Sequence, residues 1–301
     1  MEAYILTPGS APLSRSIEDY PEGIIIPIDK PYRWTSADVI RKVKFAAIRH
    51  FGKKNLKVGH AGTLDPLATG VLLVCIGKAT KLAEELQSHD KEYVAGITFG
   101  ATTPSYDLEK EIDRFFPHEH ITGTSVKEAL PAFIGEQDQI APLFSAKSVD
   151  GVRAYELARK MYRNMGKNGS EVSAGIDEAA KELIRVSRIN ITCLELLEFA
   201  AGKAAQPEGA VPKEENENFS KPSASGKGAS GRINVTDNSA LNLPRAVVRM
   251  ACSKGTYVRA FARDLGEALE SGAHLDYLQR SRSGIFRVED ALTVEQALSL
   301  L

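Results

Sequence analysis

Apolar side chains occur only in short runs along this sequence, and the longest, residues 71–76, has six members. A helix that crosses a bilayer needs roughly 20 apolar residues. The first residues also lack the basic region of a signal peptide. Runs this short are typical of buried strands or short buried helix segments. We therefore expect a folded chain without a membrane span or a signal peptide.

The chain is long enough to bury a core by itself. Its 301 residues, 43% of them hydrophobic and 26% charged, suit one large domain or two modest ones and exclude a wholly disordered or coiled-coil protein. Cys75, Cys193 and Cys252 lie far apart and form no Cys-x-x-Cys pair, which excludes a disulfide framework or a zinc ribbon. This cysteine usage favours a reducing cytoplasm.

The first half of the chain alternates between strand and helix patterns. Residues 1–22, rich in Pro, Gly and Ser, are predicted to be a flexible lead-in. Residues 24–28 are β-branched and predict a buried strand. A helix capped by Ser36 should follow, with Val39, Ile40, Val43 and Ala47 on its apolar face. Further patterns predict a strand or helix segment at 71–76, a strand at 91–100, and helices at 80–86, 125–134 and 154–161.

The second half contains two apparent insertions, at about 165–180 and 201–240. The second is rich in Gly, Ser, Asn, Lys and Glu and cannot build a core. Because it separates the apolar runs 189–197 and 246–250, the simplest prediction is a hairpin with a long tip. A helix capped by Thr256 should follow, with Val258, Phe261 and Leu265 on its buried face.

Basic residues gather in two regions although the net charge is only −1. From residue 39 to residue 64 there is no acid, and the cations are Arg41, Lys42, Lys44, Arg49, Lys53, Lys54 and Lys57. Residues 245–287 hold eight cations against four acids. Such regions are either ordinary solvated faces or the footprint of a phosphate backbone.

Two segments carry residues suited to chemistry. Residues 59–70 read Gly-His-Ala-Gly-Thr-Leu-Asp-Pro-Leu-Ala-Thr-Gly, so Asp65 is either a helix N-cap before Pro66 or part of a ligand loop. In residues 252–259, Tyr257 and Arg259 are either a core side chain and a solvated charge or binding groups. His60 is either a satisfied loop histidine or a stacking group at a cleft. His118 and His120 lack a third metal ligand at suitable spacing.

Several motifs together resemble the TruB family of tRNA pseudouridine synthases, from about residue 23 to the C-terminus. They are Asp29-Lys30-Pro31 with Thr35-Ser36, the whole of residues 59–70, Lys91-Glu92-Tyr93, Ser145-Ala146-Lys147, and residues 253–259. The resemblance implies an α+β pseudouridine-synthase fold, with a large, mixed, mostly antiparallel sheet flanked by helices and two long insertions. It implies a catalytic domain over 23–301 that isomerises the uridine at tRNA position 55.

The resemblance also implies residue roles. Asp65 matches the nucleophilic aspartate, Tyr93 the tyrosine that packs on the target base, and Arg259 the arginine that pairs with the aspartate. We expect His60, Tyr257, Leu278, Lys30 and Lys81 to bind substrate. Arg41, Lys42, Lys44, Lys53, Lys54 and Lys57 are expected to contact the RNA backbone. No cofactor or metal is implied; the expected partner is the T stem-loop of tRNA, bound by a monomer.

The sequence departs from the family pattern in two places. Many members continue into a C-terminal RNA-binding PUA domain, which we do not expect here, and Pro104 replaces the first acid of a Thr-Asp-Thr-Ser-Asp-like loop. Two other functions remain open. One is the same chemistry on ribosomal RNA, and the other is a non-catalytic RNA-binding or tRNA-chaperone module. The presence of Asp65, Tyr93 and Arg259 together argues against the second.

Overall fold

The computed structural model describes residues 2–142, 148–149, 152–153, 186–202, 233 and 235–301. They form two compact units. Of the described residues, unit 1 comprises 2–94, 233 and 277–301, and unit 2 comprises 95–142, 148–149, 152–153, 186–202 and 235–276. The predicted helix at 154–161, the insertion at 165–180, the motif at 145–147 and most of 201–240 lie outside the described residues. The expected single domain over 23–301 stays a prediction.

Unit 1 is built around strand β4 (Thr69–Ile76), the apolar run noted in the sequence. It pairs antiparallel with β2 (Ile24–Lys30) and with β3 (Val58–Ala61). It also pairs in parallel with β13 (Ala273–Ser283), through Gln279 opposite Thr69 and Arg280 opposite Gly70. The short strand β14 (Phe286–Arg287) closes a hairpin with β13. Residues 71–76 are thus a strand and not a helix segment.

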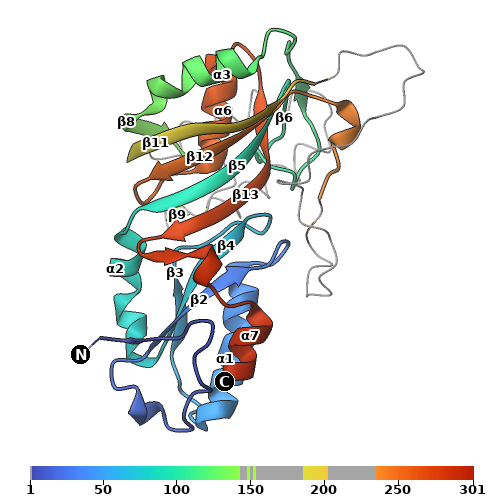
Figure 1. Cartoon of the computed structure of the whole chain (residues 1–301). Helices are drawn as coiled ribbons and strands as arrows, with labels where there is room; N and C mark the ends of the chain where they lie inside the picture. The colour runs from blue at the N-terminus through green and yellow to red at the C-terminus, as the bar shows by residue number, and fades with distance from the viewer. Residues whose placement is uncertain (1, 143–147, 150–151, 154–185, 203–232, 234) are drawn as a thin grey trace. The chain divides into compact units, whose positions relative to one another are not determined.

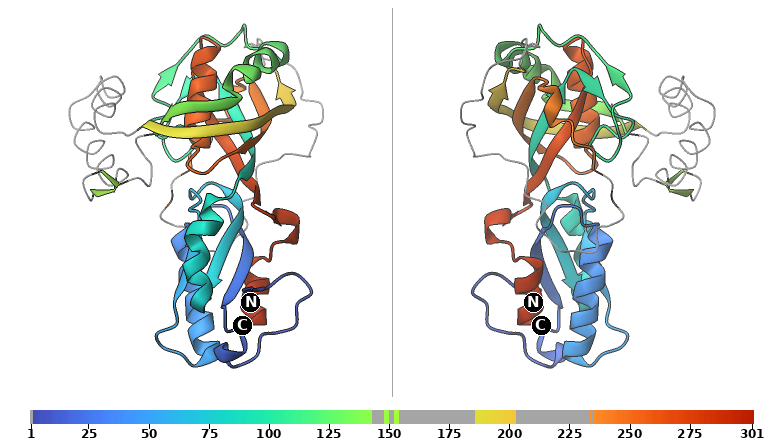
Figure 2. Two further views of the ribbon diagram at one scale, coloured as in Figure 1. Left: turned by 90° about the vertical axis from the view of Figure 1, so that its left-hand side faces the viewer. Right: turned by 90° about the vertical axis from the view of Figure 1, so that its right-hand side faces the viewer.

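Both faces of this sheet are covered by helices (Figure 1, Figure 2). Leu72, Val74 and Ile76 point to the side of α1 (Ser36–Phe51) and α7 (Val294–Leu300). The alternate residues of β4 point to the side of η2 (Gly77–Leu82) and α2 (Ala83–Ser88). Because successive side chains of a strand alternate between faces, a continuous apolar run is what a sheet covered on both sides requires.

The N-terminal lead-in is not loose, so that prediction was wrong. Strand β1 (Tyr4–Ile5) pairs in parallel with β2, and the turn η1 (Ile17–Asp19) follows. Leu6, Leu13 and Ile17 are buried in the core of unit 1. Isolated apolar anchors and a two-residue strand leave no periodic pattern, so sequence reasoning could not detect them.

Two predicted helix caps are displaced by one residue. Thr35, and not Ser36, caps α1, in a capping box with Asp38. The Ser36 hydroxyl is buried and bonds the backbone of Leu64. The helix α6 (Val258–Ala268) begins after Tyr257, while the Thr256 hydroxyl donates to the Ser253 carbonyl.

Unit 2 contains the strand order β5 (Lys91–Phe99), β12 (Arg245–Cys252), β11 (Val186–Ala200) and β8 (Gly135–Ile140). The antiparallel pairing of β11 with β12 confirms the predicted hairpin. α3 (Gly123–Ala129), η3 (Leu130–Phe133) and α6 flank these strands, and the Phe133 and Phe261 rings pack edge to face. Smaller elements are β6 (Ala101–Thr102), β7 (Arg114–Phe115), β9 (Ser148–Val149), β10 (Val152–Arg153), η5 (Ser239–Leu241) and, in unit 1, η6 (Val288–Asp290).

The predicted fold class is confirmed: the chain has a mixed α+β fold with a large, mostly antiparallel sheet flanked by helices. Strands β5 and β13 each contribute residues to both units. Among the described residues, no helix combines the length and apolar character that a membrane span needs.

Candidate functional site

Asp65 lies in the loop that joins β3 to β4, and it does not cap a helix. The only regular feature there is a turn in which the Ala68 amide donates to the Asp65 carbonyl at 3.1 Å. The alternative reading of Asp65 as an N-cap is therefore wrong. A cap would have explained an Asp-Pro pair without any function, and that explanation does not apply to the half-buried Asp65.

A buried ammonium group donates a hydrogen bond to the backbone of this loop. Lys30, at the end of β2, has no exposed surface, and its Nζ donates to the carbonyls of Pro31 (2.9 Å), Trp34 (2.5 Å) and Pro66 (3.2 Å). Burial lowers the pKa of Lys30 to about 7, and the charges of Asp65 and Asp29 oppose that shift. Substrate binding by Lys30 stays a prediction; in the structure its ammonium holds the carbonyl of Pro66, in the turn after Asp65.

A buried guanidinium holds the two ends of the same loop. Arg280 on β13 is 1% exposed, and it donates from Nε to the Val71 carbonyl at 2.7 Å and from Nη2 to the Gly62 carbonyl at 3.0 Å. Gly62 and Gly70 both have positive φ, of 86° and 96°. A Cβ at Gly62 would lie 3.3 Å from the Arg280 guanidinium, and one at Gly70 would collide with the Arg280 backbone. A side chain at Gly62 or Gly70 would therefore crowd Arg280.

His60 lies on β3, just before the loop, and is half-buried. Its Nδ1 is buried and has no hydrogen-bond partner among the described residues. Burial, and then the charge of Arg280, lower the pKa of the imidazole. A neutral ring with an unused nitrogen suits stacking or hydrogen bonding to a base.

Tyr93 and Leu278 also belong to unit 1, where both pack partly buried against the cluster formed by β2, β4 and α1. The residues beside Tyr93 fix the start of β5. The Lys91 ammonium donates to the carbonyls of Gln87 and His89 at the end of α2, and Glu92 accepts from Ser281 at 2.8 Å. The Lys-Glu-Tyr motif thus anchors the start of β5, immediately before Tyr93. Lys81 is exposed on η2.

Arg259 and Tyr257 belong to unit 2. Arg259 is 4% exposed; its Nη1 donates to the Ser105 carbonyl at 3.2 Å and lies 3.7 Å from Oδ2 of Asp107. The alternative reading of Arg259 as a solvated surface charge is therefore wrong. The backbone of Tyr257 exchanges two hydrogen bonds with the Gln139 side chain. Since Asp65 and Arg259 lie in different units, their pairing stays a proposal.

Asp107 is a residue that sequence reasoning missed. Besides facing Arg259, its carboxylate accepts from the Ser105 hydroxyl at 2.6 Å and from the Glu109 amide at 2.9 Å. In this loop Pro104 replaces one acid of the family pattern, while Asp107 retains another. The available signal was Arg259, because a buried arginine needs an acidic partner.

The two basic regions differ in the structure. Arg41, Lys42, Lys44, Lys53, Lys54 and Lys57 are all exposed. Within the described part of the chain, two of them form ion pairs, Arg41 with Asp38 (2.8 Å) and Lys53 with Glu18 (3.3 Å). In residues 245–287, by contrast, Arg259 and Arg280 are buried, and three arginines pair with acids: Arg245 with Asp276, Arg249 with Glu195, and Arg263 with Asp264. The second region is therefore not one exposed basic patch: Arg259 and Arg280 are buried, whereas the Arg249–Glu195 pair lies at the surface. Contact of this region with a phosphate backbone stays a prediction.

The sequence is similar to a known family and to named relatives. Residues 49–174 match the model of the N-terminal domain of the TruB family pseudouridylate synthases. A tRNA pseudouridine synthase B of Phocaeicola vulgatus is 46% identical over 277 residues, which cover 92% of this chain and 92% of that protein. The protein of the same name in Flavobacterium johnsoniae is 38% identical over 278 residues, covering 92% and 95%.

Solved structures share the fold. A chain in the crystal structure of a Cbf5-Nop10-Gar1 complex matches with a TM-score of 0.54 at 22% identity, covering 99% of this chain and 60% of that one. A chain in an H/ACA RNP bound to a substrate RNA containing 2'-deoxyuridine matches with a TM-score of 0.51 at 21% identity, covering 92% and 53%. The present chain thus spans between half and two thirds of the length of these structural relatives.

Proposed function

The chain belongs to the TruB family of pseudouridylate synthases, and we propose that it isomerises the uridine at position 55 of the tRNA T loop to pseudouridine. The observation that carries this proposal is the Asp65 loop. An aspartate stands in a helix-free loop between two strands, with the loop backbone bonded to two buried cations, Lys30 and Arg280. A group that reacts in one fixed geometry requires a loop that is held in place in this way.

The reaction conserves atoms and needs no cofactor. The glycosidic bond from N1 of uracil to C1' of ribose breaks, the base turns, C5 bonds to C1', and the proton on C5 transfers to nitrogen or solvent. Asp65 would act as a carboxylate, either by adding to the sugar or base or by stabilising positive charge on the ribose, as carboxylates do in glycosidases.

Arg259 would keep Asp65 ionised when the substrate excludes water, because a fixed positive charge favours the carboxylate. The burial of Arg259 and its contact with Asp107 support a fixed orientation for that guanidinium. Tyr93, Tyr257 and Leu278 would form the apolar walls around the base.

The target nucleotide must leave its stack before it can react, at a cost of about a few kcal/mol. His60, half-buried with a free Nδ1, would fill the space left in the loop. Lys81 would bind substrate. The six exposed cations from Arg41 to Lys57 would contact phosphates, which supplies affinity and orientation but little sequence reading.

The proposal includes the T stem-loop as the contacted part of tRNA, a monomer as the working form, and the cytoplasm as the location. The described cysteines support a reducing compartment, since Cys75, Cys193 and Cys252 are all free thiols.

The test uses purified protein with an unmodified tRNA transcript, and pseudouridine is mapped by position. We expect conversion of a single T-loop uridine by the wild type, and binding without turnover by Asp65→Asn. Turnover by the Asn variant would reject Asp65 as the reacting group. Efficient modification of ribosomal RNA alone would reject tRNA as the substrate, and binding without any turnover by the wild type would support a chaperone.

A further inference from the structure

We propose that the solvent face of α1 binds the backbone of the substrate RNA, and that Phe45 at the centre of this face stacks on an unpaired base. The identity of the RNA rests on the proposed function. The inference adds an aromatic contact and Arg49 to the cations already discussed, and so changes the predicted mode of binding from charge alone to charge with stacking.

Phe45 is 71% exposed, and α1 turns it directly away from the core. The buried residues Val39, Val43 and Ala47 mark the opposite side of the helix. A phenyl ring with most of its surface in water adds little to the core, and phenylalanine is a poorer helix former than Ala, Leu or Lys. A single exposed apolar residue is common by itself, so its surroundings decide the interpretation.

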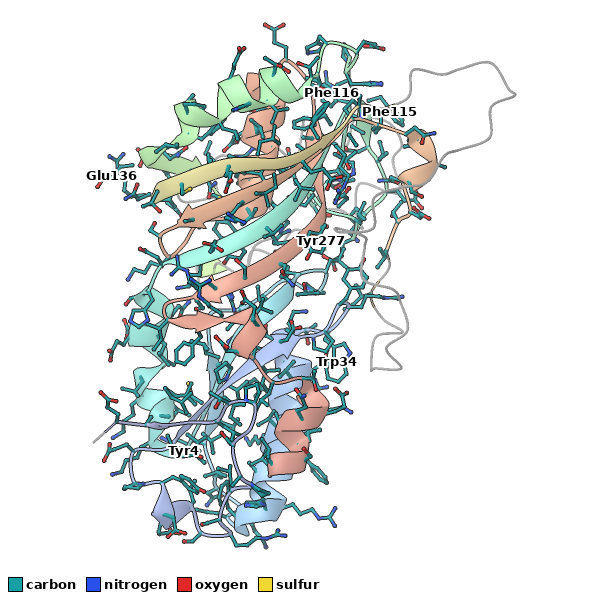
Figure 3. All side chains as sticks on the ribbon, viewed as in Figure 1. Tyr4, Trp34, Phe115, Phe116, Glu136 and Tyr277 are labelled. Atoms are coloured by element: carbon teal, nitrogen blue, oxygen red, sulfur yellow. The ribbon has the colours of Figure 1, made fainter. Side chains whose placement is uncertain are left out.

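Those surroundings are basic. Arg41 and Arg49 lie one helical turn before and after Phe45, and Lys42 lies three residues before it, so their side chains are its neighbours on the helix surface. The single acid of α1 is Asp38, which is engaged by Thr35 and Arg41. The Lys42 ammonium lies 5.3 Å from the centre of the Trp34 ring, beside the start of the helix (Figure 3).

Arginines beside an exposed aromatic ring match RNA better than a second copy of this chain. Bases splayed from a loop or bulge stack on aromatic side chains and guanidinium planes, while the cations neutralise the flanking phosphates. A two-fold dimer through this face would instead bring identical basic surfaces together, which is unfavourable because like charges repel.

The experiment measures the affinity of Phe45→Ala, Phe45→Leu, Phe45→Trp and Arg49→Ala for a tRNA transcript over a series of salt concentrations. Stacking on one base predicts an affinity about tenfold weaker for the Ala and Leu variants, with an unchanged slope of log affinity against log salt. Phe45→Trp should keep the affinity, and its indole fluorescence should fall on binding, beyond the background of Trp34. Arg49→Ala should reduce the slope by about one.

Phe115→Ala is the matched control, because Phe115 on β7 is also exposed, at 63%, and lies outside α1 (Figure 3). It should bind tRNA as the wild type does. All the variants change exposed side chains, so their thermal midpoints should stay close to that of the wild type.

Wild-type affinity of Phe45→Ala would overturn the proposal. Wild-type affinity of Phe45→Leu would reject stacking, since leucine retains apolar bulk without a π face. A Phe45-dependent dimer with unchanged RNA affinity would assign the face to a second copy. These outcomes are separate from the proposed function, because binding is measured without turnover. If the wild type forms pseudouridine and Phe45→Ala binds tRNA normally, only the present inference is rejected.

Discussion

Two regions of this chain are rich in cations, and the structure places them in opposite environments. The set on α1 and the following loop is exposed and has few acidic partners. The set in β12, α6 and β13 includes the buried Arg259 and Arg280 and the largely buried pair Arg245–Asp276. An exposed cation can exchange water for a phosphate at little cost, whereas a buried one needs fixed acceptors. The comparison shows that a count of charges does not reveal their function.

The most severe effect is expected for Arg280→Met. The change leaves the buried carbonyls of Gly62 and Val71 without their donor, which should lower the free energy of unfolding by about 2–4 kcal/mol. A small displacement of this loop would move Asp65 out of its reacting geometry. We therefore expect kcat to fall about 100-fold, with a much smaller change in KM. Single-turnover kinetics and urea unfolding measure the two effects, and Arg280→Lys, which keeps the charge, should be less affected in stability. Normal turnover of Arg280→Met would contradict a positioning role.

The buried Lys30 should differ from the exposed lysines in its effect on how stability depends on pH. Its pKa is about 7 in the folded chain and 10.5 when unperturbed. Between these values the unfolded chain holds the extra proton, so this group makes the free energy of unfolding rise with pH, and it has no such effect below about pH 7. Lys30→Met should lose this rise, which amounts to at most about 1.4 kcal/mol per pH unit.

The measurement is urea unfolding of wild type, Lys30→Met and the exposed control Lys44→Met from pH 6 to pH 10. The difference between wild type and Lys30→Met should grow in favour of the wild type as pH increases. Lys44→Met should follow the wild type throughout. Parallel curves for all three proteins would show that Lys30 titrates like a surface lysine.

Arg245→Ala should affect stability without affecting RNA binding. The Arg245 guanidinium contacts the Asp276 carboxylate at 2.6 and 3.0 Å, and Asp276 also accepts from Thr98. Its loss leaves a buried carboxylate incompletely satisfied and should cost about 1–3 kcal/mol. The salt dependence of tRNA affinity should not change. A reduced slope would place Arg245 among the phosphate contacts and break the distinction between the two sets.

The smallest effect on stability is expected for Lys53→Ala and Lys54→Ala, within about 0.5 kcal/mol of the wild type. If each lysine contacts a phosphate, each variant should reduce the slope of log affinity against log salt by about one. Binding assays between low and moderate salt measure this slope. An unchanged slope in both variants would remove this loop from the RNA interface.

Local pattern predicted the elements whose signals are local. The β-branched residues 24–28 and the apolar residues 71–76 became β2 and β4, and the 3.6-residue spacing of Val39, Val43 and Ala47 became the buried face of α1. Caps were less accurate, because Thr35 and Ser36 are both suitable caps by type; the capping box of Thr35 with Asp38 and the contact of Ser36 with Leu64 separate their roles.

The candidate site divides in the same way. The motif of residues 59–70 marked Asp65 and His60 as residues of interest, since glycines around a polar side chain are a local signal. Asp107 was missed, and the contact of Lys30 with the Asp65 loop was not foreseen, because in each case the partner lies far away in the chain. Asp107 faces Arg259, and Lys30 reaches the carbonyl of Pro66.

By itself, then, the order of residues predicted β2, β4, β5 and the β11–β12 hairpin, the helices α1 and α6, the family resemblance and the loop that carries the aspartate. Only tertiary structure decided which positive charges are buried beneath that loop and which remain in water. The physical reason is the distance along the chain: Arg280 donates to Gly62 across 218 residues. No periodicity or spacing within a short window can report a contact that exists only once β13 has paired with β4.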